Sequence, residues 1–167
     1  MHIYDESTSR QTKWCVQINW SRELTFSERQ INYIRDTIHH ARGVYCIYAK
    51  DYKFEYNPGM LQRKRWSSVI YIGSGWLDDR LNNHLSQKKN QLLNYYLSKY
   101  NLGYRFDRIV DDDPQLDWPK IVEASLLHLF GDKYGELPRA NRKREGIPEL
   151  PLDKFIIEES DNFDFRS

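Results

Sequence analysis

Residues 67–84, SSVIYIGSGWLDDRLNNH, contain the change from strand to helix on which the fold depends. Residues 69–72 are β-branched or aromatic, as strands prefer, and the Gly-Ser-Gly that follows interrupts them. Leucines then recur at every fourth position from residue 77, which predicts a helix with one apolar face. Arg80 and His84 have the same spacing and lie beside that face, so a guanidinium and an imidazole come directly after a glycine turn.

The rest of the chain predicts an α/β (α+β) fold, a small central antiparallel sheet of three strands flanked by helices. The three strands are expected at residues 44–48, 69–72 and 104–110, with a further strand near residues 14–20. Helices are expected at residues 27–42, 77–85, 91–100 and 117–130. Their ends carry the usual capping residues, which are Ser27 and Gln30, Gly43, and Asp117 followed by Pro119.

The length of 167 residues predicts one compact domain. We expect residues 1–42 to be an N-terminal extension and helix packed on the core, residues 43–145 the core, and residues 146–167 an acidic tail. Charge is unevenly distributed, because residues 1–110 hold 17 Lys and Arg against 10 Asp and Glu, a net of +7. Residues 111–167 hold 8 against 14, a net of −6. The positive part suits an anionic partner such as nucleic acid.

Several classes of protein are disfavoured by composition. No apolar run approaches the ~20 residues that span a bilayer, and the N-terminus has no apolar segment typical of a signal peptide. Two cysteines, Cys15 and Cys46, do not make a disulfide framework. We therefore expect a cytoplasmic protein with no membrane partner.

Two tripeptides, Gly43-Val44-Tyr45 and Tyr71-Ile72-Gly73, come close together if their strands pair antiparallel. They resemble the paired motifs of the GIY-YIG nuclease superfamily, with valine in the middle of the first. Four further residues follow in the order typical of that family: Arg80, His84, Glu123 and Asn141. Tyr71 stands 26 positions after Tyr45, a long hairpin that is most similar to the restriction-endonuclease branch. The resemblance covers about residues 43–145.

The resemblance implies a GIY-YIG nuclease fold with N-terminal additions, and a DNA endonuclease that hydrolyses phosphodiester bonds with Mg²⁺ or Mn²⁺. It implies that Glu123 binds the metal and that Arg80 neutralises charge on the phosphate. It also implies a tyrosine as general base. We expect Tyr45 in that role and Tyr71 as a positioning group, although the sequence leaves their order open.

The two other family positions are expected to act through hydrogen bonds. His84 would bond a tyrosine or the attacking water. Asn141 would orient the phosphate or the local backbone.

Basic residues outside the motif are expected to contact double-stranded DNA. They are Lys53, Arg63, Lys64 and Arg65 in the hairpin, and Arg142, Lys143 and Arg144 after the asparagine. Sequence-specific cleavage by so short a chain predicts a homodimer on a two-fold symmetric site. The expected enzyme is a type II restriction endonuclease. The alternatives are a structure-specific or nicking nuclease of a phage or mobile element, and a non-catalytic DNA-binding module of the same fold.

Overall fold

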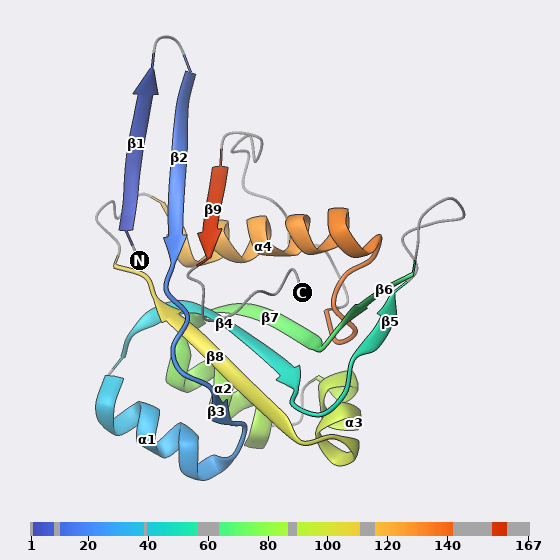
Figure 1. Cartoon of the computed structure of the whole chain (residues 1–167). Helices are drawn as coiled ribbons and strands as arrows, with labels where there is room; N and C mark the ends of the chain where they lie inside the picture. The colour runs from blue at the N-terminus through green and yellow to red at the C-terminus, as the bar shows by residue number, and fades with distance from the viewer. Residues whose placement is uncertain are drawn as a thin grey trace.

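The computed structural model describes residues 2–8, 11–38, 40–56, 64–86, 90–110, 116–141 and 155–159. The strands are β1 (His2–Thr8), β2 (Gln11–Ile18), β3 (Leu24–Thr25), β4 (Arg42–Ala49), β5 (Phe54–Tyr56), β6 (Arg65–Ser67), β7 (Val69–Trp76), β8 (Leu102–Arg108) and β9 (Phe155–Glu159). The helices are α1 (Glu28–Ile38), α2 (Leu77–Ser86), α3 (Gln91–Lys99) and α4 (Trp118–Tyr134). The expected mixture of helices with an antiparallel sheet is confirmed (Figure 1).

Four strands form an antiparallel sheet in the order β3-β8-β4-β7. The three expected strands are β8, β4 and β7, and β4 lies between the other two. The observed sheet has one strand more than the three expected. The chain before α1 pairs with the outer edge of β8 and forms β3. Leu24 and Phe26 are buried there, and the Phe26 N–H donates to the Leu102 carbonyl at 2.9 Å. Burial and hydrogen bonding together fix this extra strand.

Alternate residues of β4 and β7 point to opposite faces of the sheet. Ser74 contacts α4 through Glu123, whereas Tyr45 contacts α2 through His84. Figure 1 shows α4 on one side of these strands and α1 and α2 on the other. Because β7 is an edge strand, side chains from both helices can approach each other around its end. No helix in the described part of the chain is long and apolar enough to cross a membrane.

The N-terminal region forms a second sheet. In it β1 and β2 pair antiparallel, and β9 pairs parallel with β2 so that Trp14 stands opposite Phe155. Figure 1 shows the β1–β2 hairpin extending away from the four-stranded sheet. Part of the segment expected to be an acidic tail is thus a strand, and it pairs with β2 near the start of the chain.

Two helices end at different residues from those expected. α1 stops before His40, whose φ of 47° lies outside the helical region. Arg42, expected to end that helix, is instead the first residue of β4. α4 begins at its expected cap, Asp117, and continues to Tyr134, where Gly135 ends it with a left-handed φ of 78°.

Candidate active site

Tyr45 and Tyr71 lie on the face of the sheet that packs against α2. Their ring centroids are 6.0 Å apart, and the His84 ring is 5.9 Å from the first and 4.9 Å from the second. The Tyr45 hydroxyl oxygen is 2.7 Å from His84 Nε2, a hydrogen-bond distance. The structure thus brings three predicted residues together, and we call them the tyrosine–histidine cluster.

Gly73 makes room for this cluster. It stands opposite Tyr45 in the antiparallel register, and the tyrosine ring lies close over its Cα. A Cβ at this position would come 2.6 Å from the Tyr45 hydroxyl oxygen and 2.7 Å from Tyr71 Cε1, far inside ordinary contact distance. The glycine of the second tripeptide is therefore required by the tyrosine of the first, which is a physical reason for the two tripeptides to occur together.

Burial keeps the Tyr45–His84 pair neutral in the free protein. It raises the pKa of Tyr45 well above the usual value of 10, with Tyr71 and Glu123 raising it further and Arg80 opposing them. Burial, together with the nearby Arg80 charge, lowers the pKa of His84 from 6.5 to about 4. At neutral pH the phenol therefore keeps its proton and the imidazole stays uncharged.

A pocket of about 420 Å³ lies at the end of β7, next to the start of α4. Its lining is mostly charged and consists of Arg42, Ser74, Gly75, Trp76, Arg80, Asp117, Lys120 and Glu123. Arg80 comes from α2, yet it lines the pocket together with Glu123 of α4. Gly75 permits this approach, because its φ is 125° and a Cβ there would be only 3.0 Å from Arg80 Nε.

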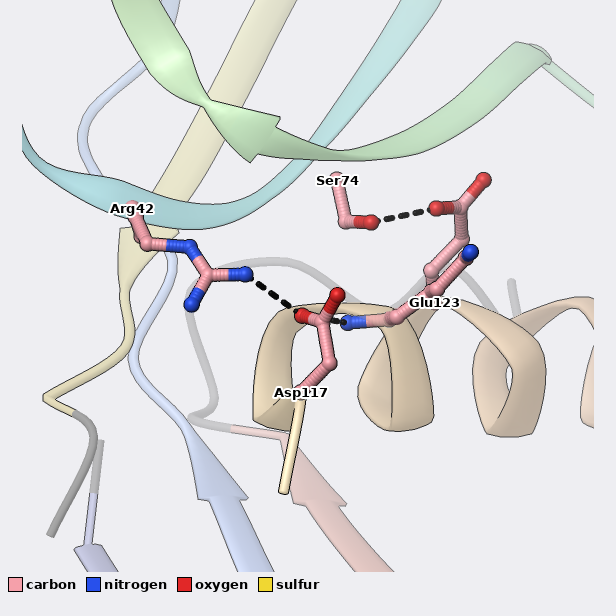
Figure 2. Close-up of polar contacts among 5 residues, drawn as sticks. Arg42, Ser74, Asp117 and Glu123 are labelled. Atoms are coloured by element: carbon pink, nitrogen blue, oxygen red, sulfur yellow. Dashed lines mark hydrogen bonds and ion pairs between the residues drawn. The ribbon is translucent and has the colours of Figure 1, made fainter. Parts of the chain in front are cut away.

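Glu123 is a buried carboxylate, with 5% of the residue exposed. Ser74 Oγ donates a hydrogen bond of 2.5 Å to Glu123 Oε2, as Figure 2 shows. Its neighbours along α4, Val122 and Ala124, are buried as well. A buried carboxylate is costly unless its charge is compensated. Ser74 already bonds this carboxylate, and Arg80 and Lys120 bring positive charge to the same pocket.

These residues fit a Mg²⁺ ion that binds together with a substrate. Within the described ranges no three His, Cys, Asp or Glu side chains are grouped closely enough to hold a metal by themselves. Mg²⁺ is commonly held by one or two carboxylates, with waters and substrate phosphate oxygens completing the octahedron. Glu123 and the hydroxyl of Ser74 are oxygen donors of the kind that Mg²⁺ prefers.

An ion pair that the sequence does not predict lies at the mouth of the pocket. Arg42 Nη2 is 2.6 Å from Asp117 Oδ1 (Figure 2). Asp117 also caps α4 by accepting from the Lys120 N–H, so the pair joins the start of β4 to the helix that carries Glu123. Because α1 ends before His40, Arg42 belongs to β4. Alternate residues of a strand share a face, so Arg42 lies on the same face of the sheet as Val44 and as Ser74, which stands opposite Val44.

Asn141 acts on the backbone of β7. Its Oδ1 accepts from the Ile72 N–H at 3.0 Å, and its Nδ2 donates to the Ile72 carbonyl at 2.8 Å. One side chain thus satisfies both backbone groups of Ile72 on the open edge of the sheet, as a neighbouring strand would. Of the two roles expected for Asn141, these contacts match the orientation of the local backbone.

Three of the basic residues expected to contact DNA are described. Lys53 and Arg65 are exposed at the β5–β6 hairpin, and Lys64 Nζ forms an ion pair of 2.5 Å with Glu55 Oε1. The others, which are Arg63, Arg142, Lys143 and Arg144, lie outside the described residues. All three cations are therefore exposed, and one of them, Lys64, is already in an ion pair.

The six predicted catalytic residues thus form three groups. Arg80 and Glu123 line the pocket, the tyrosine–histidine cluster packs under α2, and Asn141 lies on the edge of β7. Comparison of the chain with protein-family models, curated proteins and solved structures finds no match.

Proposed function

We propose that this chain is a cytoplasmic Mg²⁺- or Mn²⁺-dependent endonuclease of the GIY-YIG kind that hydrolyses phosphodiester bonds in double-stranded DNA. The observation that carries the proposal is the meeting of Arg80 and Glu123 in one pocket, although they come from different helices. Hydrolysis of a phosphodiester needs a fixed positive charge for the phosphate and a carboxylate that can hold a cation. Both residues line one pocket, which supports their action on one phosphate.

Arg80 binds the phosphate in this mechanism. Its planar guanidinium matches two phosphate oxygens and stabilises the negative charge that grows on them during attack. Glu123 holds the metal ion, and the hydrogen bond from Ser74 fixes the orientation of its carboxylate. When bound, the ion supplies Lewis-acid stabilisation of the phosphate and of the leaving oxygen.

The tyrosine–histidine cluster handles the proton of the attacking water. Tyr45 is buried, so it receives this proton by a relay through Tyr71, the partly buried member of the cluster, which accepts the proton of the water and passes its own hydroxyl proton to the Tyr45 oxygen. The Tyr45 hydroxyl proton passes in turn to His84 Nε2 along the 2.7 Å hydrogen bond. This transfer requires the His84 tautomer with its proton on Nδ1. Because the pKa of Tyr45 is raised and that of His84 is lowered, the transfer accompanies attack on the bound phosphate and does not precede it.

We further propose type II restriction cleavage by a homodimer. Cutting both strands at a two-fold symmetric sequence uses two identical active sites, one from each copy of the chain. In this proposal the exposed Lys53, which precedes β5, and Arg65 of β6 contact the DNA backbone. A structure-specific nicking enzyme is the alternative, and the cleavage products separate the two.

Incubation of the purified protein with supercoiled plasmid tests the proposal. We expect cutting with Mg²⁺ or Mn²⁺ and none with EDTA. Discrete linear fragments would identify restriction cleavage, whereas nicked circles alone would identify the alternative. Plasmid that stays supercoiled with every divalent metal tested would overturn the proposed function.

The matched variants are Glu123→Gln and Glu136→Gln. Glu123 lies in the pocket, whereas Glu136 follows the end of α4 and forms an ion pair with Arg139 at 3.5 Å. We expect the first substitution to abolish cutting and the second to leave it unchanged. Equal rates for the two variants would remove Glu123 from the mechanism.

A further inference from the structure

Trp76 is an exposed indole at the rim of the pocket. It is the last residue of β7, it is 45% exposed, and it lines the same pocket as Arg80 and Glu123. The other large hydrophobic residues that the structure shows as exposed, such as Tyr95 and Leu129, do not line this pocket. An indole left in water beside a charged site is positioned to bind part of a ligand.

Two neighbours hold the indole in place. The Arg42 guanidinium lies 5.9 Å from the centre of its ring and is itself held by Asp117. The His40 ring meets it edge-on, at 6.0 Å and 89°. In the β-ladder Arg42 stands directly opposite Trp76, so the backbone fixes this arrangement as well.

The charges around the indole indicate what it binds. Arg42, Arg80 and Lys120 supply three positive charges to the pocket, against the two carboxylates of Asp117 and Glu123. A purely apolar ligand gains little from such a lining, and a phosphate ion alone has no use for the indole. A nucleotide combines an anionic phosphate with a flat aromatic base, and it matches both features.

We propose that Trp76 stacks an unpaired base of the nucleotide adjacent to the cleaved phosphate, while Arg42 and Lys120 bind the phosphate of that nucleotide. This inference rests on the proposed function and specifies the DNA that the site accepts. A base that stacks on the indole has left the base stack of the duplex. The substrate is therefore DNA that is single-stranded at the cut or opened there on binding.

Binding measured by fluorescence anisotropy tests this inference, with EDTA present to prevent cleavage. The probes are labelled (dT)12, an abasic strand of equal length, a duplex with one unpaired thymine, and the fully paired duplex. We expect the wild-type protein to bind (dT)12 about tenfold more tightly than the abasic strand. Trp76→Ala should abolish that preference, and Trp76→Phe should keep most of it.

The matched control is Tyr95→Ala, since Tyr95 is 50% exposed on α3 and lies outside the pocket. It should bind all four probes as the wild type does. Lys120→Ala should show the opposite pattern to Trp76→Ala, because loss of one phosphate contact lowers the slope of log affinity against log salt by about 0.7 on a single strand. Its preference for bases over abasic sites should remain. A variant that failed to fold would lose both the preference for bases and the salt dependence, so the two opposite patterns cannot come from misfolding.

The four probes also distinguish the outcomes. Dependence on Trp76 for both (dT)12 and the duplex with the unpaired thymine supports an unstacked base, and dependence for (dT)12 alone restricts the substrate to single strands. An equal loss on the abasic strand would overturn the stacking role, because that strand has no base to stack, whereas a loss on the fully paired duplex would mean that the duplex is opened on binding. An unchanged affinity of Trp76→Ala for (dT)12 would also overturn it while leaving the nuclease proposal intact. Failure of the wild type to bind any probe would overturn both.

Discussion

The two faces of β7 differ in charge and in access to water. On one face, Ser74 and Trp76 adjoin a pocket rich in arginine, lysine and carboxylate groups. On the other, Tyr71 joins the buried and neutral Tyr45–His84 pair. Because side chains alternate along a strand, one short segment supplies both environments within a few residues.

In the proposed nuclease, this difference separates two tasks that one site must combine. Stabilising an anionic phosphate requires permanent charges that substrate can reach, whereas moving a proton requires groups that are neutral and shielded. Arg80 connects the two sides, because it lines the pocket and its charge also acts on Tyr45 and His84. Gly75 lets the arginine pass close to the end of the strand.

Removing Arg80 should have the largest effect on the charged side. We expect Arg80→Ala to slow single-turnover DNA cleavage by about 10²–10³-fold, because one charged contact to the transition state is lost. Arg80→Lys keeps a positive charge but loses the planar guanidinium that binds two phosphate oxygens, so it should restore the cleavage rate only in part. A cleavage rate for Arg80→Ala within about threefold of wild type would exclude this role.

The buried side predicts a dependence of stability on pH. His84 has a pKa of about 4 in the folded protein and 6.5 as an unperturbed group, so between these values the unfolded chain binds the proton and the folded chain does not. The free energy of unfolding should therefore decrease as the pH falls from 6.5 to about 4, by up to about 3 kcal/mol.

Urea unfolding at about pH 7 and about pH 4.5 measures this dependence. His84→Gln should flatten it. The control His128→Gln should not, because His128 has 40% of its side chain exposed and pairs with Asp132 on the surface of α4. Parallel pH curves for wild type and His84→Gln would show that the imidazole is not buried as a neutral group.

Gly73→Ala tests the packing between the two tripeptides. The added methyl group would meet the Tyr45 ring at 2.6 Å, and overpacking of this kind costs about 1–3 kcal/mol of stability. The cost should be smaller in a Tyr45→Ala background, where the ring is gone. Additive losses in urea unfolding would mean that the tyrosine is not what requires glycine here.

Asn141→Ala should lower the free energy of unfolding by an amount within the range given for Gly73→Ala. It removes two neutral hydrogen bonds to Ile72, worth about 1 kcal/mol each. Asn141→Asp retains the acceptor for the Ile72 N–H and loses the donor, so its stability should be intermediate. Hydrogen exchange at the Ile72 amide should accelerate in the alanine variant, and unchanged exchange would contradict the contact.

Local patterns in the sequence predict those parts of the fold that local interactions determine. The helix that begins at Leu77, the cap at Asp117 and the three main strands all follow from nearby residues. The expected interruption of the strand at Gly73-Ser74-Gly75 is wrong, because β7 stays paired with β4 through these residues as far as Trp76. β3 and β9 were not expected, because each is defined by pairing with a strand far away in the chain. Arg42 and Trp76 were missed for a related reason. They enter the site only through the register between β4 and β7.

Locating the bound metal tests the central claim, that metal-dependent chemistry takes place in the pocket between β7 and α4. Fe²⁺ can replace Mg²⁺ in the presence of duplex DNA, and ascorbate with peroxide then cuts the polypeptide near the bound ion. Mass spectrometry of the fragments identifies the positions. We predict cuts beside Ser74 and beside Glu123, which lie together at the pocket, and their loss in Glu123→Gln. Cuts elsewhere in the chain, or cuts at these positions that persist in Glu123→Gln, would contradict the claim.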